Sequence, residues 1–302
     1  MSDLVVLVGP TASGKTALGA ALAERVGGEV VSADAFAVYR GFDIGTAKPN
    51  MALRARVPHH LVDVADPSGR YSAGTFVRDA DAAIVDIRRR GRVPVVVGGT
   101  HFYVRALLFG LFPEPPKDER LRVRLELEWE RDAAAVRRRL EEIDSVAAAR
   151  VLPNDRQRIL RALEVCLVSG RRVTELWDEH RQDEARYAFV MLGLNPPRAA
   201  LHATIELRVR RMFAAGLLRE VEALLAGGLS PRAHALKAIG YRESCRVLAG
   251  ELTVPQAVQK ATEATRQLAK RQMTWLRAET NVRWLTGRVD EMLSQAYARV
   301  EV

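Results

Sequence analysis

Short apolar runs and longer amphipathic stretches alternate along the first third of the chain. Residues 4–8 are all Leu or Val, residues 29–32 read Glu-Val-Val-Ser, and residues 93–97 read Val-Pro-Val-Val-Val. Runs of this length predict β-strands, and those without polar alternation predict strands that are covered on both faces. Because helix-like patterns separate the runs, we expect an α/β fold with a parallel sheet flanked by helices.

Several longer stretches carry apolar residues at helical spacing. Ser72 stands where the N-cap of one such helix is expected. Asn154 is the expected N-cap of another, and Gly170 follows its last turn. The helices that this spacing predicts span residues 72–90, 154–169, 197–215, 217–226 and 255–279.

The pattern changes at a proline-rich segment, residues 113–116. Beyond it, charged residues alternate with Leu, Ala and Val at helical spacing, until residues 187–194 again resemble a strand. We therefore expect a catalytic core made of residues 1–113 and 187–302. A helical insertion domain is expected at residues 114–186, with the proline-rich segment as one stem of its hinge.

The segment between the first strand and the following helix reads GPTASGKT, residues 9–16. A glycine-bounded loop followed by Lys and Thr at a helix start is typical of a phosphate-binding P-loop. Its backbone N–H groups favour an anion, Lys15 adds a positive charge, and the Thr16 hydroxyl can join the shell of a magnesium ion. A polyphosphorylated ligand with Mg²⁺ is therefore expected at Gly9, Pro10, Thr11, Ala12, Ser13, Gly14, Lys15 and Thr16.

Two further polar features follow predicted strands. Asp34 comes after the second strand, and Gly98-Gly99-Thr100 turns away from the third. The carboxyl ends of parallel strands meet at one edge of a sheet, so these residues are expected on the same rim as the P-loop. The loop-rich stretch 35–70 follows Asp34, and a loop of this length in a compact domain is usually functional.

Composition narrows the cellular setting. The chain has 302 residues, 48% of them hydrophobic, which suits one large or two modest globular domains. No apolar run approaches the length that spans a bilayer, so we expect no membrane association. Residues 1–3 leave no room for a signal peptide, and Cys166 and Cys245 are isolated, so a cytoplasmic protein without disulfides is expected.

The charge is uneven along the chain. Of the net charge of +9, residues 195–302 contribute +7, which favours a polyanionic partner. Within the helix expected at 255–279, Arg266, Lys270 and Arg277 form a basic row on one side. This basic row fits a solvated surface and a contact with nucleic acid equally well.

Taken in order, the motifs of this chain match one family. They are GPTASGKT at 9–16, SADAFAVYRGFDIGTAKP at 32–49, VPHHLVDVADP at 57–67, VPVVVGGT at 93–100, LPNDRQRILRALEV at 152–165, KAIGYRE at 237–243 and ATRQLAKRQMTWLR at 264–277. The chain resembles the bacterial tRNA dimethylallyltransferases, also called tRNA isopentenyltransferases or the IPP transferase family. The likeness covers nearly the whole chain.

This resemblance implies an activity. Enzymes of the family transfer a dimethylallyl group from dimethylallyl diphosphate to N6 of adenosine 37, on the 3′ side of the tRNA anticodon. The implied partners are thus the tRNA anticodon stem-loop and dimethylallyl diphosphate, the latter on the P-loop with Mg²⁺. Metal and backbone charges stabilise the departing diphosphate, and a carboxylate can take the proton from the attacking nitrogen. We expect the enzyme to act as a monomer.

The resemblance also assigns roles to individual residues. Asp34 matches the proposed general base of the family, Thr11 matches a threonine placed near the bridging oxygen of the diphosphate, and Arg208 matches an arginine proposed to bind the leaving diphosphate. Thr16 is the expected metal ligand. The positions that align with tRNA contacts are Asp34, Ala35, Phe36, Ala37, Thr100, Arg122, Gln157, Arg158, Ile159, Leu160, Arg161, Lys237, Ala238, Ile239, Gly240, Tyr241 and Arg242. The chain departs from the family at Ala35 and Ala37, where Ser and a polar or larger residue are usual.

Three other functions share parts of this pattern. A small-molecule P-loop kinase would bind ATP and could draw lid arginines from the insertion. An adenylate isopentenyltransferase would use the same donor with free AMP, ADP or ATP as acceptor. A non-enzymatic RNA-binding module would have no use for an intact P-loop followed by Asp34.

Overall fold

The computed structural model describes residues 4–112, 115, 118–179 and 184–300. The chain divides into two compact units, residues 1–108 with 186–302, and residues 109–185. The first unit holds the sheet and the P-loop, whereas the second consists of helices and loops where it is described. Of the proline-rich segment that was expected to form a hinge stem, Pro113, Glu114 and Pro116 lie outside the described residues.

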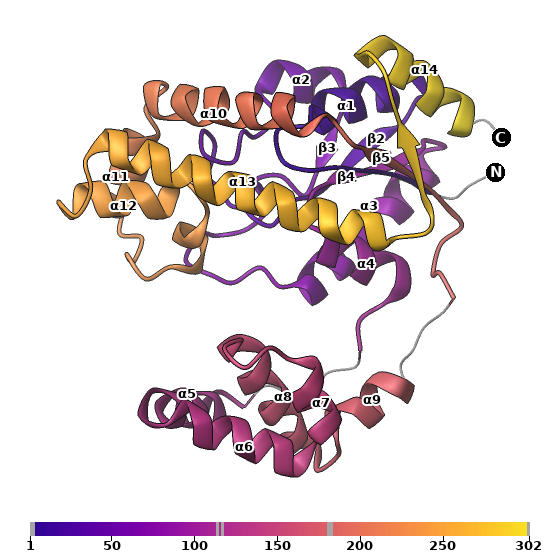
Figure 1. Ribbon diagram of the computed structural model, residues 1–302. Coiled ribbons are helices and arrows are strands. Elements are labelled where there is room, and N and C mark those ends of the chain that lie inside the picture. The colour runs from indigo at the N-terminus through magenta and orange to yellow at the C-terminus, as the bar shows by residue number, and fades with distance from the viewer. Residues whose placement is uncertain (1–3, 113–114, 116–117, 180–183, 301–302) are drawn as a thin grey trace. The chain divides into compact units, whose positions relative to one another are not determined.

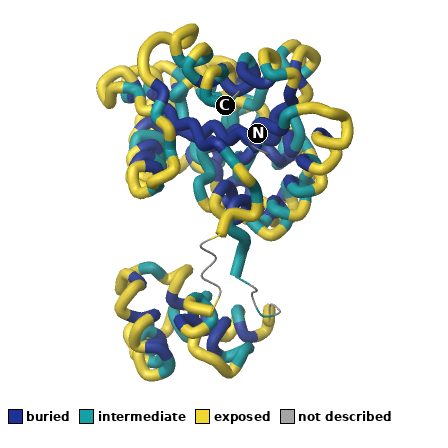
Figure 2. Tube along the Cα trace, turned by 90° about the vertical axis from the view of Figure 1, so that its right-hand side faces the viewer, coloured by how far each residue is buried: buried dark blue, intermediate teal, exposed yellow. Residues whose placement is uncertain are grey.

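The described strands form one parallel six-stranded sheet in the order β3-β2-β4-β1-β5-β6. β1 is central and buried along its whole length, with Val6 aligned to Val96 of β4 and to Met191 of β5. Figure 2 shows this buried layer running through the first unit. The strands are β1 Leu4–Val8, β2 Glu29–Ala33, β3 His59–His60, β4 Pro94–Gly98, β5 Phe189–Leu194 and β6 Val282–Leu285.

Helices cover both faces of the sheet, as Figure 1 shows. On one face, Leu18 and Leu22 of α1 (Lys15–Arg25) pack with Leu7 of β1, and α14 (Val289–Val300) packs beside α1. On the other, α3 (Ala73–Arg89) contacts β2 and β4, and α4 (His101–Phe109) follows β4. The expected parallel sheet flanked by helices is therefore confirmed.

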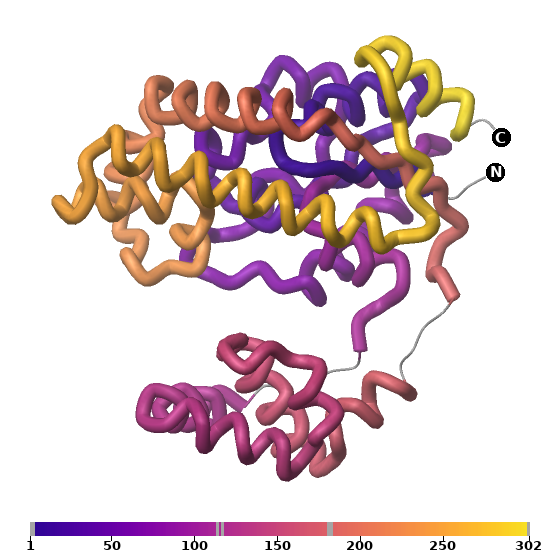
Figure 3. Tube along the Cα trace, in the orientation of Figure 1, coloured from indigo at the N-terminus to yellow at the C-terminus, as the bar shows by residue number. Residues whose placement is uncertain are grey.

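Four helices from the last third of the chain pack at one end of the sheet. They are α10 (Arg198–Ala214), α11 (Leu217–Ala226), α12 (Tyr241–Leu248) and α13 (Val254–Ala278), and a 3₁₀ turn spans His234–Lys237. α10 lies along α13 and α11 along α12, which Figure 3 follows in orange and yellow. The Thr253 side chain caps α13 by accepting a hydrogen bond from the Gln256 N–H.

The second unit has its own apolar core. Leu125, Leu140, Ile159 and Leu163 are almost completely buried in it. Buried Asp144 accepts hydrogen bonds from the backbone N–H groups of Ala147 and Thr174, and these bonds lower its pKa against the opposing effect of burial. The helices are α5 Glu119–Arg131, α6 Ala133–Ile143, α7 Ser145–Arg150, α8 Arg156–Ser169 and α9 Val173–Glu179.

Some elements differ from the expectation. Strands β3 and β6, helix α14 and the short helix α2 (Met51–Arg56) were not expected. The expected cap of α8 was wrong by one residue, because Asp155, not Asn154, accepts the hydrogen bond from the Arg158 N–H. No helix among the described residues combines the length and the apolar character needed to cross a membrane.

Candidate active site

The P-loop connects β1 to α1 through two residues in left-handed backbone conformations. Ala12 has φ 65° and Gly14 has φ 85°. A left-handed conformation is strained for Ala but not for Gly. Gly14 is also the N-cap of α1 and supplies no side-chain acceptor, so the first N–H groups of the helix remain directed at the loop. Among the described residues, the buried Ser13 hydroxyl has no hydrogen-bond partner.

Lys15 lies inside this loop. Its Nζ donates to the Pro10 carbonyl at 3.3 Å. Burial lowers the pKa of Lys15 to about 8, Asp34 opposes the shift, and the positive charge of Arg208 adds to it. A second positive charge and a carboxylate therefore lie close enough to influence the P-loop lysine.

Asp34 is held at the carboxyl end of β2 by its own following turn. Its Oδ1 accepts hydrogen bonds from the N–H groups of Phe36, at 2.9 Å, and Ala37, at 3.1 Å. The Thr100 hydroxyl accepts from the Ala35 N–H at 3.1 Å, which ties this turn to the end of β4. Among the described residues Oδ2 receives no hydrogen bond, so one carboxylate oxygen is available to a ligand.

Arg208 approaches the same space from α10. Burial lowers the pKa of its guanidinium, and the nearby Asp34 carboxylate opposes that shift. Its Nη2 lies 3.5 Å from the Thr46 carbonyl oxygen. Thr11, Lys15, Asp34, Thr100 and Arg208 all line one cavity of about 400 Å³. The structure thus brings together the P-loop, Asp34 and Arg208, which lie far apart in the sequence.

Gln272 of α13 is a site residue that the sequence analysis did not single out. Its Oε1 accepts a hydrogen bond from the Thr11 N–H at 2.8 Å, and its Nε2 donates to the Gly99 carbonyl at 2.8 Å. It also lines the cavity. The only sequence signal was its place within the ATRQLAKRQMTWLR motif, because both contacts are with residues distant in the chain.

Aromatic side chains lie at the edge of the cavity. Trp275 is 52% exposed and stacks on His101, with ring centroids 5.4 Å apart, and Phe102 is 64% exposed. Glu279 Oε1 lies 3.0 Å from His101 Nε2. Burial lowers the pKa of His101, although Glu279 opposes this. Through these contacts His101 supports the Trp275 ring at the edge of the cavity.

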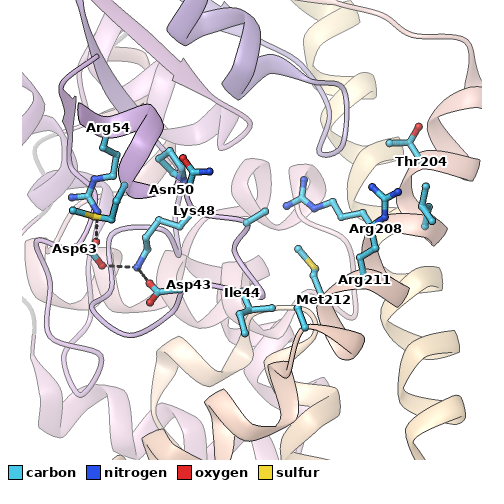
Figure 4. A pocket seen from close by; sticks show the side chains of 15 residues that line it. Asp43, Ile44, Lys48, Asn50, Arg54, Asp63, Thr204, Arg208, Arg211 and Met212 are labelled. Carbon is cyan, nitrogen blue, oxygen red and sulfur yellow. Dashed lines mark hydrogen bonds and ion pairs between the residues drawn. The ribbon is translucent and has the colours of Figure 1, made fainter. Parts of the chain in front are cut away.

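The loop 42–49 separates this cavity from a second one. The second cavity, of about 800 Å³, shares Ala47, Lys48, Pro49 and Arg208 with the first. Figure 4 shows Lys48 between Asp43 and Asp63 on one side, with Arg208 on α10 across the space. Lys48 Nζ lies 2.6 Å from Asp43 Oδ1 and 2.5 Å from Asp63 Oδ1, so ion pairs fix this wall.

Residues 237–242, expected at a tRNA-facing turn, divide by burial. Lys237 and Arg242 are exposed, whereas Tyr241 and Ala238 are buried. The Tyr241 ring packs on Phe42, and its hydroxyl accepts a hydrogen bond from the Gly45 N–H at 3.2 Å. The side chain of Tyr241 therefore supports the 42–49 loop and does not reach the surface.

The residues expected to meet tRNA from α8 also divide. Gln157 and Arg158 are exposed, Leu160 is partly buried, and Ile159 belongs to the core of the second unit. Arg122 and Arg161 both bond to buried Glu164, at 2.7 Å and 2.6 Å. These bonds lower the pKa of Glu164 against the effect of burial. The pair of arginines is thereby held in a fixed arrangement.

A parallel α/β sheet with a P-loop, a carboxylate and a buried arginine around one cavity defines a P-loop protein that acts on phosphorylated ligands. A family model described as IPP transferase matches residues 37–279. The chain belongs to the IPP transferase family, and the resemblance noted from the motifs is confirmed.

Related sequences align with this chain over almost its whole length. The tRNA dimethylallyltransferase of Anaeromyxobacter dehalogenans (strain 2CP-C) is 50% identical over 290 residues, which are 95% of this chain and 96% of the relative. That of Geobacter sulfurreducens is 46% identical over 285 residues, 94% of this chain and 92% of the relative.

Solved structures are similar to this chain as well. The full-length tRNA isopentenylpyrophosphate transferase from Bacillus halodurans has a TM-score of 0.75 and 36% identity, covering 100% of this chain and 96% of its own. A eukaryotic dimethylallyltransferase acting on tRNA has a TM-score of 0.81 and 27% identity, covering 93% of this chain and 73% of its own.

Proposed function

We propose that this protein transfers a dimethylallyl group from dimethylallyl diphosphate to N6 of adenosine 37 in tRNA. The products are N6-(dimethylallyl)adenosine in tRNA and diphosphate. The new C–N bond replaces the C–O bond of the donor, and the proton lost by nitrogen passes to a base. Membership of the IPP transferase family and relatives named tRNA dimethylallyltransferase support this assignment.

The observation that carries the proposal is the position of Asp34 opposite the P-loop. Asp34 and Lys15 line the same cavity, and the Asp34 carboxylate opposes the lowering of the Lys15 pKa by burial. A diphosphate on the loop would be stabilised as it departs by backbone N–H groups, Lys15 and Arg208. The available Oδ2 of Asp34 would accept the proton of the attacking amino group.

Thr16 is the proposed magnesium ligand. It lies in the first turn of α1, is exposed, and lines the cavity, so its hydroxyl fits a metal that also binds diphosphate oxygens. When bound, Mg²⁺ would neutralise charge on the leaving diphosphate. Thr11, at the turn of the loop, is proposed to lie near the bridging oxygen.

tRNA is proposed to contact both units. The exposed Gln157 and Arg158, with Arg122 and Arg161 fixed on Glu164, would meet the RNA from the second unit. Lys237, Arg242, Thr100 and the 34–37 turn would meet it from the first. Because its acceptor is tRNA, we place the enzyme in the cytoplasm.

One assay separates this function from its alternatives. The protein is incubated with labelled dimethylallyl diphosphate, Mg²⁺, and either undermodified tRNA or AMP. Label in tRNA supports the proposal, and label in AMP supports an adenylate isopentenyltransferase. Thermal stabilisation by ATP, with none by the prenyl donor, would support a kinase.

A further inference from the structure

One side-chain amide joins two glycine-containing turns of the active site. Gln272 accepts from the Thr11 N–H of the P-loop and donates to the Gly99 carbonyl after β4, both at 2.8 Å. Its two ends have opposite hydrogen-bonding character, and each meets the partner that it requires. The approach depends on Gly99, because a Cβ there would lie 2.5 Å from Gln272 Nε2.

The same line of contacts continues to Asp34. Next to Gly99, the Thr100 N–H donates to the Ala33 carbonyl at 3.3 Å, and the Thr100 hydroxyl accepts from the Ala35 N–H at 3.1 Å. Ala33 and Ala35 are the neighbours of Asp34 on either side. Gln272 therefore connects the loop that holds the donor to the turn that holds the carboxylate.

We propose that Gln272 is a positioning residue that sets the separation between the P-loop and Asp34. This inference rests on the proposed function, since transfer needs the diphosphate and the acceptor nitrogen held in line across the cavity. A misplacement of about 1 Å in such an arrangement can slow a reaction about 100-fold. The pairing of Val8 with Gly98 already brings the two turns together, and Gln272 joins them a second time from α13.

Two variants test this role. Gln272→Met removes both hydrogen bonds at similar size. Gln272→Glu keeps the acceptor for the Thr11 N–H but places a carboxylate oxygen against the Gly99 carbonyl, which repels it. Protonation of that glutamate restores a donor. Gln259→Met is the matched control, because Gln259 lies exposed on the same helix and bonds only to Glu263 among the described residues.

The measurement is single-turnover transfer at saturating donor and tRNA, with the Kd of each substrate determined separately. We expect Gln272→Met to slow transfer by about 10- to 100-fold while both Kd values change less than about threefold. The transfer rate of Gln272→Glu should approach that of wild type as the pH falls from 8 toward 5. The Gln259→Met variant should match wild type.

Other outcomes overturn the inference. An unchanged rate for Gln272→Met excludes positioning. A weaker tRNA Kd with a normal rate at saturation identifies Gln272 as an RNA contact. A Gln272→Glu variant that transfers as fast as wild type at every pH excludes a role for the hydrogen bond to the Gly99 carbonyl.

Failure of the proposed function is recognised separately. In that case wild type transfers no label, and the inference is judged by hydrogen exchange of the P-loop. The Thr11 N–H should then exchange faster in Gln272→Met than in Gln259→Met, and equal exchange refutes the inference.

Discussion

Tyr241 and Phe42 stack with ring centroids 4.4 Å apart. One residue belongs to the KAIGYRE segment and the other to the loop between the two cavities, nearly two hundred residues earlier. The Tyr241 hydroxyl also donates to Glu220 Oε1, and Glu220 Oε2 accepts from the Ile44 N–H at 2.9 Å. The aromatic pair and the carboxylate together fix the loop that carries Lys48.

Tyr241→Phe keeps the ring stack and removes the hydroxyl. The partly buried Gly45 N–H and the Glu220 carboxylate then lose a partner, so the free energy of unfolding should fall by about 1–3 kcal/mol. Urea denaturation measures this loss, and Tyr103→Phe, which removes a bond to the Tyr71 carbonyl, is a buried comparison. If Tyr241→Phe lowers turnover and Tyr103→Phe does not, the 42–49 loop affects catalysis. An unchanged free energy of unfolding in Tyr241→Phe would contradict the hydrogen bonds of the Tyr241 hydroxyl described above.

Asp34→Asn tests the general base. Asparagine keeps a side-chain oxygen for the N–H groups of Phe36 and Ala37, so the turn should persist. It cannot accept the proton at neutral pH, so single-turnover transfer should fall by roughly 10² to 10⁴ with little change in donor affinity. The rate is measured over a range of Mg²⁺ concentrations. Full recovery at high Mg²⁺ would instead identify Asp34 as part of the metal site.

Binding of diphosphate should depend on the proton of Lys15. Its pKa in the protein is about 8, below its ordinary value, so Lys15 loses its charge as the pH rises through that value. The affinity for inorganic pyrophosphate should therefore weaken by up to about tenfold per pH unit above pH 8, as one lost proton requires. Calorimetric titration at a series of pH values measures this affinity. The Lys15→Met variant should bind pyrophosphate weakly, and its affinity should change less with pH. Equal slopes of log affinity against pH in the variant and in wild type would exclude Lys15 as the group that loses the proton.

The same shift has a consequence for stability. A lysine whose pKa is lower in the folded state than in the unfolded state disfavours folding while it is protonated in both. Lys15 should therefore make the protein more stable as the pH rises from about 8 toward 10.5, the ordinary pKa of lysine. In Lys15→Met this contribution to the pH dependence of unfolding should vanish, and its persistence would show that another group causes it.

Arg158→Ala should weaken tRNA binding without affecting the donor. Its side chain is 62% exposed, and its Nε lies 3.4 Å from Asp155 Oδ2, a long ion pair at the surface. Removal of this side chain should therefore leave the second unit intact. A lost phosphate contact should reduce the slope of log affinity against log salt by about one. Arg172→Ala, at a residue 65% exposed in the same unit, is the control. Equal tRNA affinity in both variants would remove Arg158 from the interface.

Local patterns sufficed for the centre of the fold but not for its edges. β1, the P-loop and α1 follow one another directly, so their order alone predicted them. β3 has two residues, too few to show a period, and β6 alternates between partly exposed and exposed positions before one buried residue. Their strand character comes from pairing with β2 and β5.

The site divides in the same way. The P-loop and Asp34 follow strands and could be placed on one rim, whereas Gln272 and Glu220 act through partners far away in the chain. Gln272 lies within the ATRQLAKRQMTWLR motif, but the motif does not show which turns its side chain joins, and nothing around Glu220 in the sequence distinguishes it from other polar residues on helices. The burial of Tyr241 could not be predicted either, because it depends on Phe42.

The central place of β1 has a consequence for synthesis on the ribosome. The first strand to be translated is flanked by β4 and β5, and α1 is covered by α14 near the other end of the chain. A nascent polypeptide that has emerged only as far as β4 has half of the partners of β1 and none of those that α14 supplies. Much of this unit must therefore fold late in translation, and the apolar face of β1 and α1 stays uncovered until the later strands and α14 have emerged.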